Sequence, residues 1–168
     1  MKELWYEMTV KDYNRAVENY SDNVYRFILK NIKNKEKARD IVQDSFEKLW
    51  IKHEMINASK AKSYLFSIAY HTMIDLIRKE NRISDLEAIS KEKLTYEIQY
   101  TDLNEILHRA INLLPEAQKS VIMLRDYEGY TYAEIAEITG LNESQVKVYI
   151  YRGRVFLKNY IVSPEKVI

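Results

Sequence analysis

Residues 143–158 carry the clearest chemistry in this sequence. The segment holds four basic residues and one acidic residue. Side chains three or four positions apart lie on one face of a helix, and a row of cations on such a face is suited to binding phosphate groups. The outward face predicted for this helix consists of Ser144, Lys147, Val148, Tyr151, Arg152 and Val155, with Gln145 and Arg154 at its edges. We call these residues the basic face, and it is the first candidate binding surface.

A helix-turn-helix pattern in residues 131–158 positions the basic face. The apolar residues of a first short helix are Ile135, Ala136 and Ile138. This helix should end at Gly140, because glycine readily adopts the left-handed conformation that closes a helix. Leu141 then fills the corner, and Asn142 is suited to cap the next helix. The buried stripe of the second helix consists of Val146, Ile150, Gly153 and Leu157. A hairpin used only for packing would not need the basic face, so the pattern favours a helix that enters a DNA major groove.

A second candidate surface lies on the helix predicted for residues 35–53. Asp40, Gln43, Asp44 and Glu47 follow one another at intervals of three and four, which places them on one polar face. We call these four residues the acidic strip. The residues alone leave two interpretations open. The strip is either a solvated helix face or a surface that binds basic groups of a partner.

A third candidate surface combines aromatic and basic side chains in residues 53–82. The residues are Lys60, Lys62, Tyr64, Phe66, Tyr70, His71, Arg78, Lys79 and Arg82. Aromatic rings stack on bases and cations bind phosphates, a combination typical of proteins that bind single-stranded DNA. The alternative is an ordinary core stripe, which Tyr64, Leu65, Ile68, Ala69 and Ile74 would partly fill. Both interpretations stay open at this point.

The sequence contains no recognisable catalytic or metal-binding set. His53, His71 and His108 have no ligand spacing to one another or to carboxylates. A glycine-rich phosphate loop is also absent from the sequence. We therefore expect no bound metal, no cofactor and no enzymatic activity of the chain itself.

Length and composition restrict the fold. The chain has 168 residues, of which 46% are hydrophobic, enough for a packed core. Three glycines and two prolines are too few for a β-sandwich or barrel, and the apolar spacing is helical, so we expect an all-α fold. The sequence has no cysteine, no long apolar run and no recognisable signal peptide, which favours a cytoplasmic protein without membrane insertion. The net charge is only +1, so DNA binding would depend on local patches.

The apolar periodicity also predicts the order of the elements. Helices are expected over residues 12–32, 35–53, 61–81, 102–114 and 115–127, with Pro115 in the first turn of the last. Residues 53–60 interrupt the pattern and are predicted to form a loop. The helices group into two small domains, residues 1–82 and 104–162, joined by an acidic linker over 83–103 and followed by a tail over 163–168.

Three blocks of this sequence resemble one protein family. Residues 38–46, ARDIVQDSF, together with Trp50 resemble the A-x-D-x-x-Q-x-x-F core of region 2.2 in bacterial sigma factors. Residues 63–79 look like region 2.3–2.4, and residues 113–158 resemble region 4. With only these two domains, the chain is similar to the extracytoplasmic-function (ECF) class of the sigma-70 family. It differs from the family pattern at His71, where asparagine is usual, at Tyr149, where arginine is common, and at Gly153, where alanine is common.

The resemblance implies a dissociable subunit that directs core RNA polymerase to promoters and helps to melt them. Asp40, Ile41, Gln43, Asp44 and Glu47 would dock the clamp coiled coil of the polymerase, whose flap region is a second expected contact. The melted minus-ten element would be bound by the loop over residues 53–60 and by Lys60, Lys62, Tyr64, Phe66, Tyr70, His71, Arg78 and Lys79. His71 would donate a hydrogen bond to an extruded base. The minus-thirty-five element would contact Ser144, Gln145, Lys147, Val148, Tyr151, Arg152 and Arg154.

The expected partners are therefore core RNA polymerase and promoter DNA, and an anti-sigma factor is a further candidate. The alternative function is a stand-alone helix-turn-helix regulator whose N-terminal helices bind an effector or dimerise. The two functions differ in one property. A regulator binds duplex DNA by itself, whereas a sigma factor needs core polymerase to do so.

Overall fold

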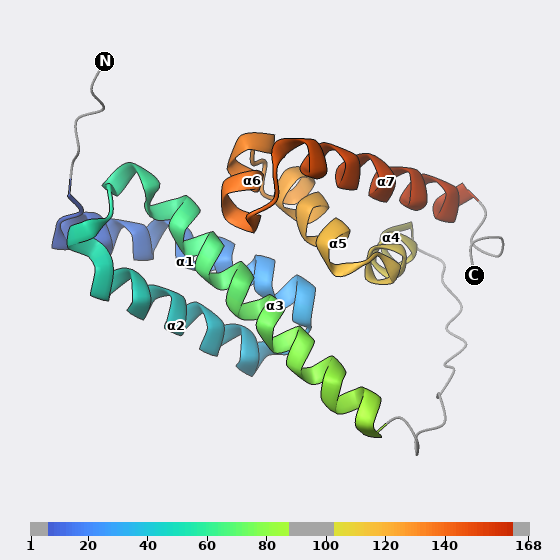
Figure 1. The fold of residues 1–168 in the computed structure, drawn as a ribbon, viewed down its shortest axis with the longest axis horizontal. Coiled ribbons are helices and arrows are strands. Elements are labelled where there is room, and N and C mark those ends of the chain that lie inside the picture. The colour runs from blue at the N-terminus through green and yellow to red at the C-terminus, as the bar shows by residue number, and fades with distance from the viewer. Residues whose placement is uncertain (1–6, 88–102, 163–168) are drawn as a thin grey trace. The chain divides into compact units, whose positions relative to one another are not determined.

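The computed structural model describes residues 7–87 and 103–162. Within these two ranges the chain is helical (Figure 1), and its β pairing is limited to an isolated bridge between Glu7 and Asn57. The chain forms two compact units, an N-terminal helical bundle and a C-terminal helical unit. The prediction of an all-α protein with two small domains is confirmed. Most of the predicted linker and the predicted tail lie outside the described residues.

The N-terminal unit consists of three long helices, α1 (Val10–Ile32), α2 (Lys35–Lys52) and α3 (Ala61–Glu87). Thr9 and Asp12 form a capping box at the start of α1. The Thr9 hydroxyl accepts from the Asp12 N–H at 3.2 Å, and the Asp12 carboxylate accepts from the Thr9 N–H at 2.9 Å. The hydrogen bonds that the Thr9 backbone N–H and the Thr9 hydroxyl donate to the Asp12 carboxylate lower the pKa of Asp12. Asn34 caps α2 by accepting from the Lys37 N–H at 3.0 Å. Local side chains thus satisfy backbone donors and fix where α1 and α2 begin.

Aromatic rings connect the three helices. Tyr13 of α1 contacts Phe46 and Trp50 of α2, with ring centroids 6.5 and 4.9 Å apart. The Tyr13 hydroxyl also donates to the Phe46 carbonyl at 3.1 Å, and burial raises the pKa of Tyr13. Phe27 of α1 meets Phe66 of α3 at 5.8 Å. Further buried apolar residues are Ala16, Val24, Ile28, Ala38, Ile41, Leu49, Leu65, Ala69 and Met73. The apolar stripes of the sequence are therefore the faces that pack.

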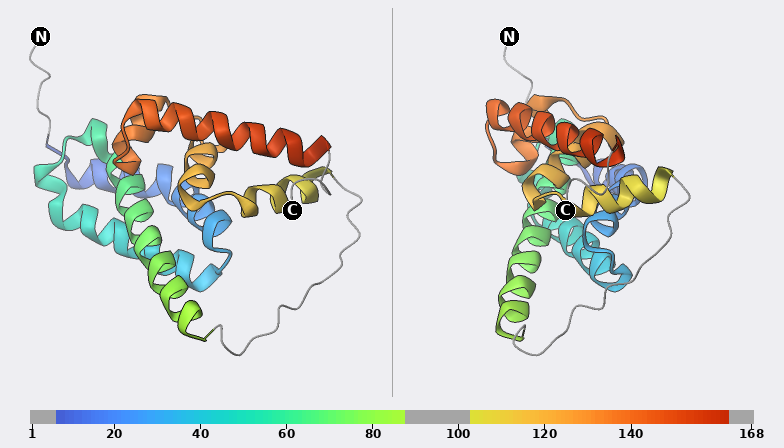
Figure 2. Two further views of the ribbon diagram at one scale, coloured as in Figure 1. Left: turned by 45° about the vertical axis from the view of Figure 1, so that its right-hand side comes forward. Right: turned by 90° about the vertical axis from the view of Figure 1, so that its right-hand side faces the viewer.

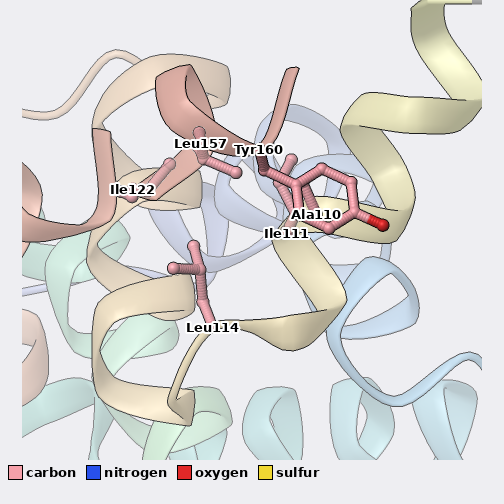
Figure 3. Close-up of a cluster of buried hydrophobic side chains, with 6 residues drawn as sticks. All are labelled: Ala110, Ile111, Leu114, Ile122, Leu157 and Tyr160. Carbon is pink, nitrogen blue, oxygen red and sulfur yellow. The ribbon is translucent and has the colours of Figure 1, made fainter. Parts of the chain in front are cut away.

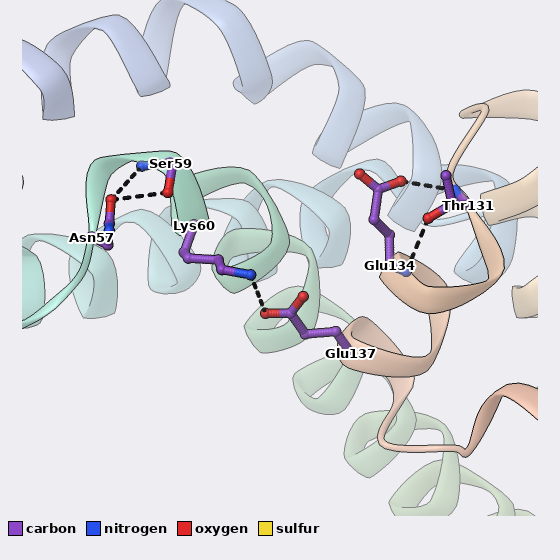
Figure 4. Close-up of polar contacts among 6 residues, drawn as sticks. All are labelled: Asn57, Ser59, Lys60, Thr131, Glu134 and Glu137. Carbon is purple, nitrogen blue, oxygen red and sulfur yellow. Dashed lines mark hydrogen bonds and ion pairs between the residues drawn. The ribbon is translucent and has the colours of Figure 1, made fainter. Parts of the chain in front are cut away.

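The loop predicted over residues 53–60 contains two short 3-10 turns, His53–Met55 and Ala58–Lys60. Asn57 organises the second turn. Its side-chain oxygen accepts hydrogen bonds from the Ser59 backbone N–H at 3.0 Å and from the Ser59 hydroxyl at 2.9 Å (Figure 4). The loop is also tied to the residues before α1, because the Met8 N–H donates to the Ile56 carbonyl at 3.1 Å. The chain therefore enters α3 from a turn held by side-chain hydrogen bonds.

Helix α3 is longer than the sequence pattern predicted. It continues to Glu87, past the expected end at residue 81 and into the expected linker. The side chains of residues 81–86 are all exposed, so burial imposes no apolar periodicity on them. The segment also contains neither glycine nor proline, the residues that most often interrupt a helix. The pattern ended where burial ended, although the helix continues.

The C-terminal unit contains α4 (Leu103–Leu113), α5 (Glu116–Ile122), α6 (Tyr132–Thr139) and α7 (Glu143–Val162). Helix α7 packs against α5 and α4 (Figure 2). The cluster that joins these helices consists of Ala110, Ile111, Leu114, Ile122, Leu157 and Tyr160 (Figure 3). Ile106, Leu107 and Phe156 pack against this cluster. The core therefore holds one face of α7 and leaves its other face outward.

The helix predicted over residues 115–127 has two irregular features. Pro115 stands before α5 in the N-cap position, not in its first turn, and its backbone there is extended with ψ 144°. After Ile122 the chain continues as a π-helical segment, Met123–Tyr127. A π turn has wider hydrogen-bond spacing than an α turn, so the side chains along it are rotated from the positions that α periodicity gives. Periodicity in the sequence could not reveal this change.

Helices α5 and α7 approach each other closely at Gly153. A Cβ atom added to this glycine would overlap Cδ1 of Ile122 and lie 3.3 Å from its Cγ1. Glycine inside a helix costs about 1 kcal/mol relative to alanine. The structure gives the reason for accepting this cost, because the missing side chain provides the space that Ile122 fills. This contact sets the distance between the two helices.

We predict that Gly153→Ala destabilises the C-terminal unit by about 1 kcal/mol, since overpacking costs about 1–3 kcal/mol and better helix propensity offsets only part of it. Ile122→Val alone should cost about 1 kcal/mol. The double variant should be at least about 0.5 kcal/mol more stable than the sum of the two effects, because removing Cδ1 relieves the overlap. Urea unfolding followed by circular dichroism measures all three.

Gly129→Ala is the matched control for this cycle. Gly129 has a positive φ of 74° but no atom within 4 Å of an added Cβ. Its substitution should be destabilising through backbone strain alone and additive with Ile122→Val. Additivity of Gly153→Ala with Ile122→Val would contradict the proposed steric conflict.

Candidate functional site

The helix-turn-helix begins each of its two helices with a reciprocal capping box. At α6 the Thr131 N–H donates to the Glu134 carboxylate at 2.8 Å, and the Glu134 N–H donates to the Thr131 hydroxyl at 3.2 Å (Figure 4). Gly140 ends α6 with φ 76°, as predicted. At α7 the Gln145 N–H donates to the Asn142 side chain at 2.8 Å, which confirms Asn142 as the cap. The predicted helix–turn–helix sequence pattern is therefore the observed one.

Helix α7 has the two faces that the sequence predicted. The predicted buried stripe, Val146, Ile150, Gly153 and Leu157, is buried, and Tyr160 extends it. Every residue of the basic face is exposed, including Gln145 and Arg154 at its edges. The basic face is therefore available for contacts outside the chain.

The two edge residues of the basic face have partners within the C-terminal unit. The Gln145 side-chain oxygen accepts from the Asn142 N–H at 3.0 Å and completes the capping box. Arg154 donates to both carboxylate oxygens of Asp126, at 2.5 and 3.3 Å. The hydrogen bond with Asp126 raises the pKa of Arg154. The sequence predicted both side chains as DNA contacts, and in the structure each of them also has an intramolecular partner.

The π-helical segment adds residues to this surface that sequence reasoning missed. The Arg125 guanidinium lies 4.9 Å from the centre of the Tyr132 ring and donates to the Tyr130 carbonyl at 2.8 Å. The Lys147 ammonium is 5.9 Å from the centre of the same ring. A shallow groove of about 280 Å³ lies here, lined by Tyr132, Lys147, Ile150, Tyr151, Arg154, Val155 and Lys158. No pattern in the sequence indicated that Arg125 and Tyr132 belong to this surface. The π segment and the turn before α6 bring them to α7, and helix periodicity does not reveal either feature.

The acidic strip lies along α2 as predicted. Asp40, Gln43 and Glu47 are exposed, and Asp44 is half-buried with its carboxylate 2.8 Å from the Lys48 ammonium. Beside the strip is a groove of about 270 Å³ lined by Lys37, Asp40, Ile41, Asp44, Thr72 and Leu76. Lys37 also forms an ion pair with Glu80 of α3. The strip thus borders a hollow between α2 and α3.

Three residues of the predicted binding sets are buried. Phe66 packs on Phe27 in the core, and Tyr70 is almost fully covered. Both were expected to contact melted DNA, and the structure places their side chains in the core of the N-terminal unit. Ile41 is buried as well, so its contribution to a partner surface is limited to the wall of the groove beside the acidic strip. In each case the residue lies on the apolar stripe of its helix, which accounts for its burial.

Tyr64 and His71 remain accessible and line one groove of about 510 Å³ between α2 and α3. The full lining is Lys48, Ile51, Lys52, Tyr64, Ser67, Ile68, His71, Thr72 and Asp75. The cations Lys60, Lys62, Arg78 and Lys79 are exposed or half-buried along α3 and the turn before it. The groove combines an aromatic ring, a histidine and two lysines, which suits an unpaired nucleotide.

The proton position on His71 follows from its hydrogen bond. Nδ1 lies 2.7 Å from the Ser67 carbonyl oxygen, which can only accept, so Nδ1 carries the proton. The neutral ring then presents Nε2 as an acceptor. In this tautomer the predicted donation from His71 to a base edge would require a proton on Nε2, and the role of His71 stays a prediction.

Among the residues that the structure describes, no three or more histidine, aspartate or glutamate side chains are grouped to hold a metal ion. In the same part of the chain, no helix is long and apolar enough to cross a membrane.

Comparison with known proteins identifies the family of this chain. A family model described as Sigma-70 region 2 matches residues 16–83, and one described as Sigma-70, region 4 matches residues 104–157. RNA polymerase sigma factor SigV of Bacillus subtilis is 36% identical over 144 residues, which span 82% of this chain and 84% of SigV. The chain belongs to the sigma-70 family, in its ECF class.

Other ECF sigma factors are similar over most of their length. SigM of Bacillus subtilis is 28% identical over 83% of this chain and 88% of SigM. The solved structure of the sigma factor RpoE from Bartonella quintana, in complex with the anti-sigma factor NepR, has a TM-score of 0.73 and 26% identity. It covers 93% of this chain and 99% of that one. The two-domain fold is therefore that of known ECF sigma factors.

We predict that Gln145 acts in this sigma factor through the capping box. Gln145→Ala should lower the stability of the C-terminal unit by on the order of 0.5–1 kcal/mol, whereas Gln145→Glu should preserve it, because glutamate also accepts from the cap. Thermal unfolding measures this difference. Promoter selection with the Gln145→Ala variant should return the sequence preference of the unsubstituted protein. A changed preference at one base pair would show that the Gln145 amide reads DNA.

Proposed function

We propose that this sigma factor binds core RNA polymerase through the acidic strip, holds melted minus-ten DNA in the groove of Tyr64 and His71, and binds the minus-thirty-five element through α7. The observation that carries the proposal is the presence of two exposed surfaces of opposite charge on different units. The acidic strip suits a basic protein partner, and the basic face suits DNA. A stand-alone regulator would need only the second surface.

Within α7, we assign the DNA contacts to Ser144, Lys147, Val148, Tyr151, Arg152 and Val155. Gln145 and Arg154 are left out because each has the intramolecular partner described above. Lys147 and Arg152 are exposed cations that would bind phosphates or base edges. The chain contributes binding and positioning in this proposal, and the polymerase performs the chemistry.

An anti-sigma factor is a further proposed partner. The similar sigma factor RpoE of Bartonella quintana was solved in complex with one. A cytoplasmic location follows from the proposed partners, since RNA polymerase and promoter DNA are found there. The experiment that separates a sigma factor from a stand-alone regulator is a gel-shift assay with duplex promoter DNA. A shift that requires core polymerase supports the proposal, and an equally strong shift without it supports the regulator.

The acidic strip should be essential for assembly with core polymerase. We predict that Gln43→Lys with Asp44→Lys weakens binding at least about 30-fold, because losing a hydrogen-bonded charge pair at an interface costs about 2 kcal/mol or more. Stability should change by no more than about 0.5 kcal/mol per site, since Gln43 is exposed and Asp44 is only half-buried. Fluorescence anisotropy with labelled protein measures the affinity.

Glu18→Lys serves as the control for charge reversal, because Glu18 is an exposed carboxylate on α1, a different helix from the strip. It should leave the affinity unchanged. Normal assembly by the double variant would mean that the acidic strip is only a solvated face.

The groove of Tyr64 and His71 should be needed for melting but not for assembly. We predict that Tyr64→Ala and His71→Ala spare polymerase binding yet block open-complex formation, because an extruded base must recover a few kcal/mol of lost stacking in its pocket. Permanganate reactivity of unpaired thymines reports melting. A promoter with a preformed bubble should restore most of the activity.

Tyr64→Phe keeps the ring and should retain most of the melting. Full opening of intact duplex by both alanine variants would place the melting function elsewhere in the chain.

A further inference from the structure

Three large apolar side chains form a stripe on the outward side of α7. Val148, Tyr151 and Val155 are 42%, 70% and 41% exposed. Their spacing of three and then four residues places them on one face of the helix. The core uses the opposite stripe of α7, which starts at Val146. These three side chains lie outside the buried stripe, and partly exposed hydrocarbon at this position suggests a contact outside the chain.

The charges around the stripe indicate what kind of molecule covers it. Lys147 and Arg152 are adjacent in sequence to Val148 and Tyr151, and Lys158 lies one turn beyond Val155. All three cations are exposed. An apolar stripe flanked by cations is complementary to the major groove, in which phosphates border the base edges.

Two polar side chains beside the stripe already form hydrogen bonds within the protein. The Gln145 oxygen belongs to the capping box, and the Arg154 guanidinium is paired with Asp126. The centre of the contact surface is thus hydrocarbon. The major groove displays one exposed hydrocarbon group among its standard bases, the C5-methyl group of thymine.

We propose that Val148, Tyr151 and Val155 read the methyl groups of thymines in the minus-thirty-five element. The inference rests on the proposed function, because it assumes that α7 enters the major groove there. The N-terminal part of a recognition helix contacts base edges most directly, so Val148 and Tyr151 carry most of the discrimination. Val155, at the other end of the stripe, lies nearer to the DNA backbone.

Deoxyuridine tests the proposal, because it lacks the methyl group of thymine and keeps the same base pairing. The assay uses the complete sigma factor assembled with core polymerase and a promoter that this complex selects from genomic DNA. Replacing thymine by deoxyuridine in the minus-thirty-five element alone should weaken binding about fourfold for each contacted methyl group. The same replacement in the spacer between the two promoter elements should have no effect.

Substitutions in α7 connect this loss to individual side chains. Val148→Ala should weaken binding to the thymine promoter and abolish the deoxyuridine penalty at one position, as expected for a coupled pair. Val162→Ala is the matched control, because Val162 is 74% exposed at the far end of the same helix. It should retain the full penalty.

Two results would overturn the inference while leaving the proposed function intact. One is equal affinity for thymine and deoxyuridine promoters, with the minus-thirty-five preference preserved. The other is a selected minus-thirty-five element without any A·T pair. Loss of core polymerase binding by Val148→Ala would also overturn it and assign the stripe to a protein contact. If the assembled complex shows no minus-thirty-five preference at all, the proposed function itself fails.

Discussion

The close contact of Gly153 with Ile122 is the constraint on which the C-terminal unit depends. It brings α7 near α5 on the side of α7 that faces the cluster around Leu157. The packing of that side decides which residues of α7 are buried and which face outward. A binding surface on a helix is defined only when the helix cannot turn. The basic face of α7 is therefore a consequence of packing on the opposite side of the same helix.

Side-chain caps have a similar role at the starts of the helices. Thr9 with Asp12, Thr131 with Glu134 and Asn142 with Gln145 each form a reciprocal pair. These contacts span three residues, so they form without help from distant parts of the chain. Each helix of the helix-turn-helix thus has its first turn specified locally. The packing of α4, α5 and α7 then needs only to orient helices whose starts are already defined.

The sequence was sufficient to predict what depends on local pattern. Helix periodicity predicted the buried and exposed faces of α7, and residue types predicted the turn at Gly140 and the cap at Asn142. Prediction from the sequence failed where tertiary packing determines the position of a residue. Aromatic residues suit both a core and a base-binding surface, so Phe66 could not be separated from Tyr64 without the structure. The pairing of Arg154 with Asp126 joins residues far apart in the chain, and the π segment that carries Asp126 does not follow α periodicity. The end of α3 was missed because exposed helices lack an apolar pattern.

The outward side of α7 contains two kinds of position, and they differ in how freely they can evolve. Gln145 and Arg154 serve the fold, so most replacements there would first weaken the domain. Val148, Tyr151 and Val155 lie outside the buried stripe and are 42%, 70% and 41% exposed, so changing them need not weaken the fold. Under the proposed function, a lineage could therefore acquire new promoters through these three positions without compensating substitutions in the core. The regulon could diverge while the scaffold stays constant.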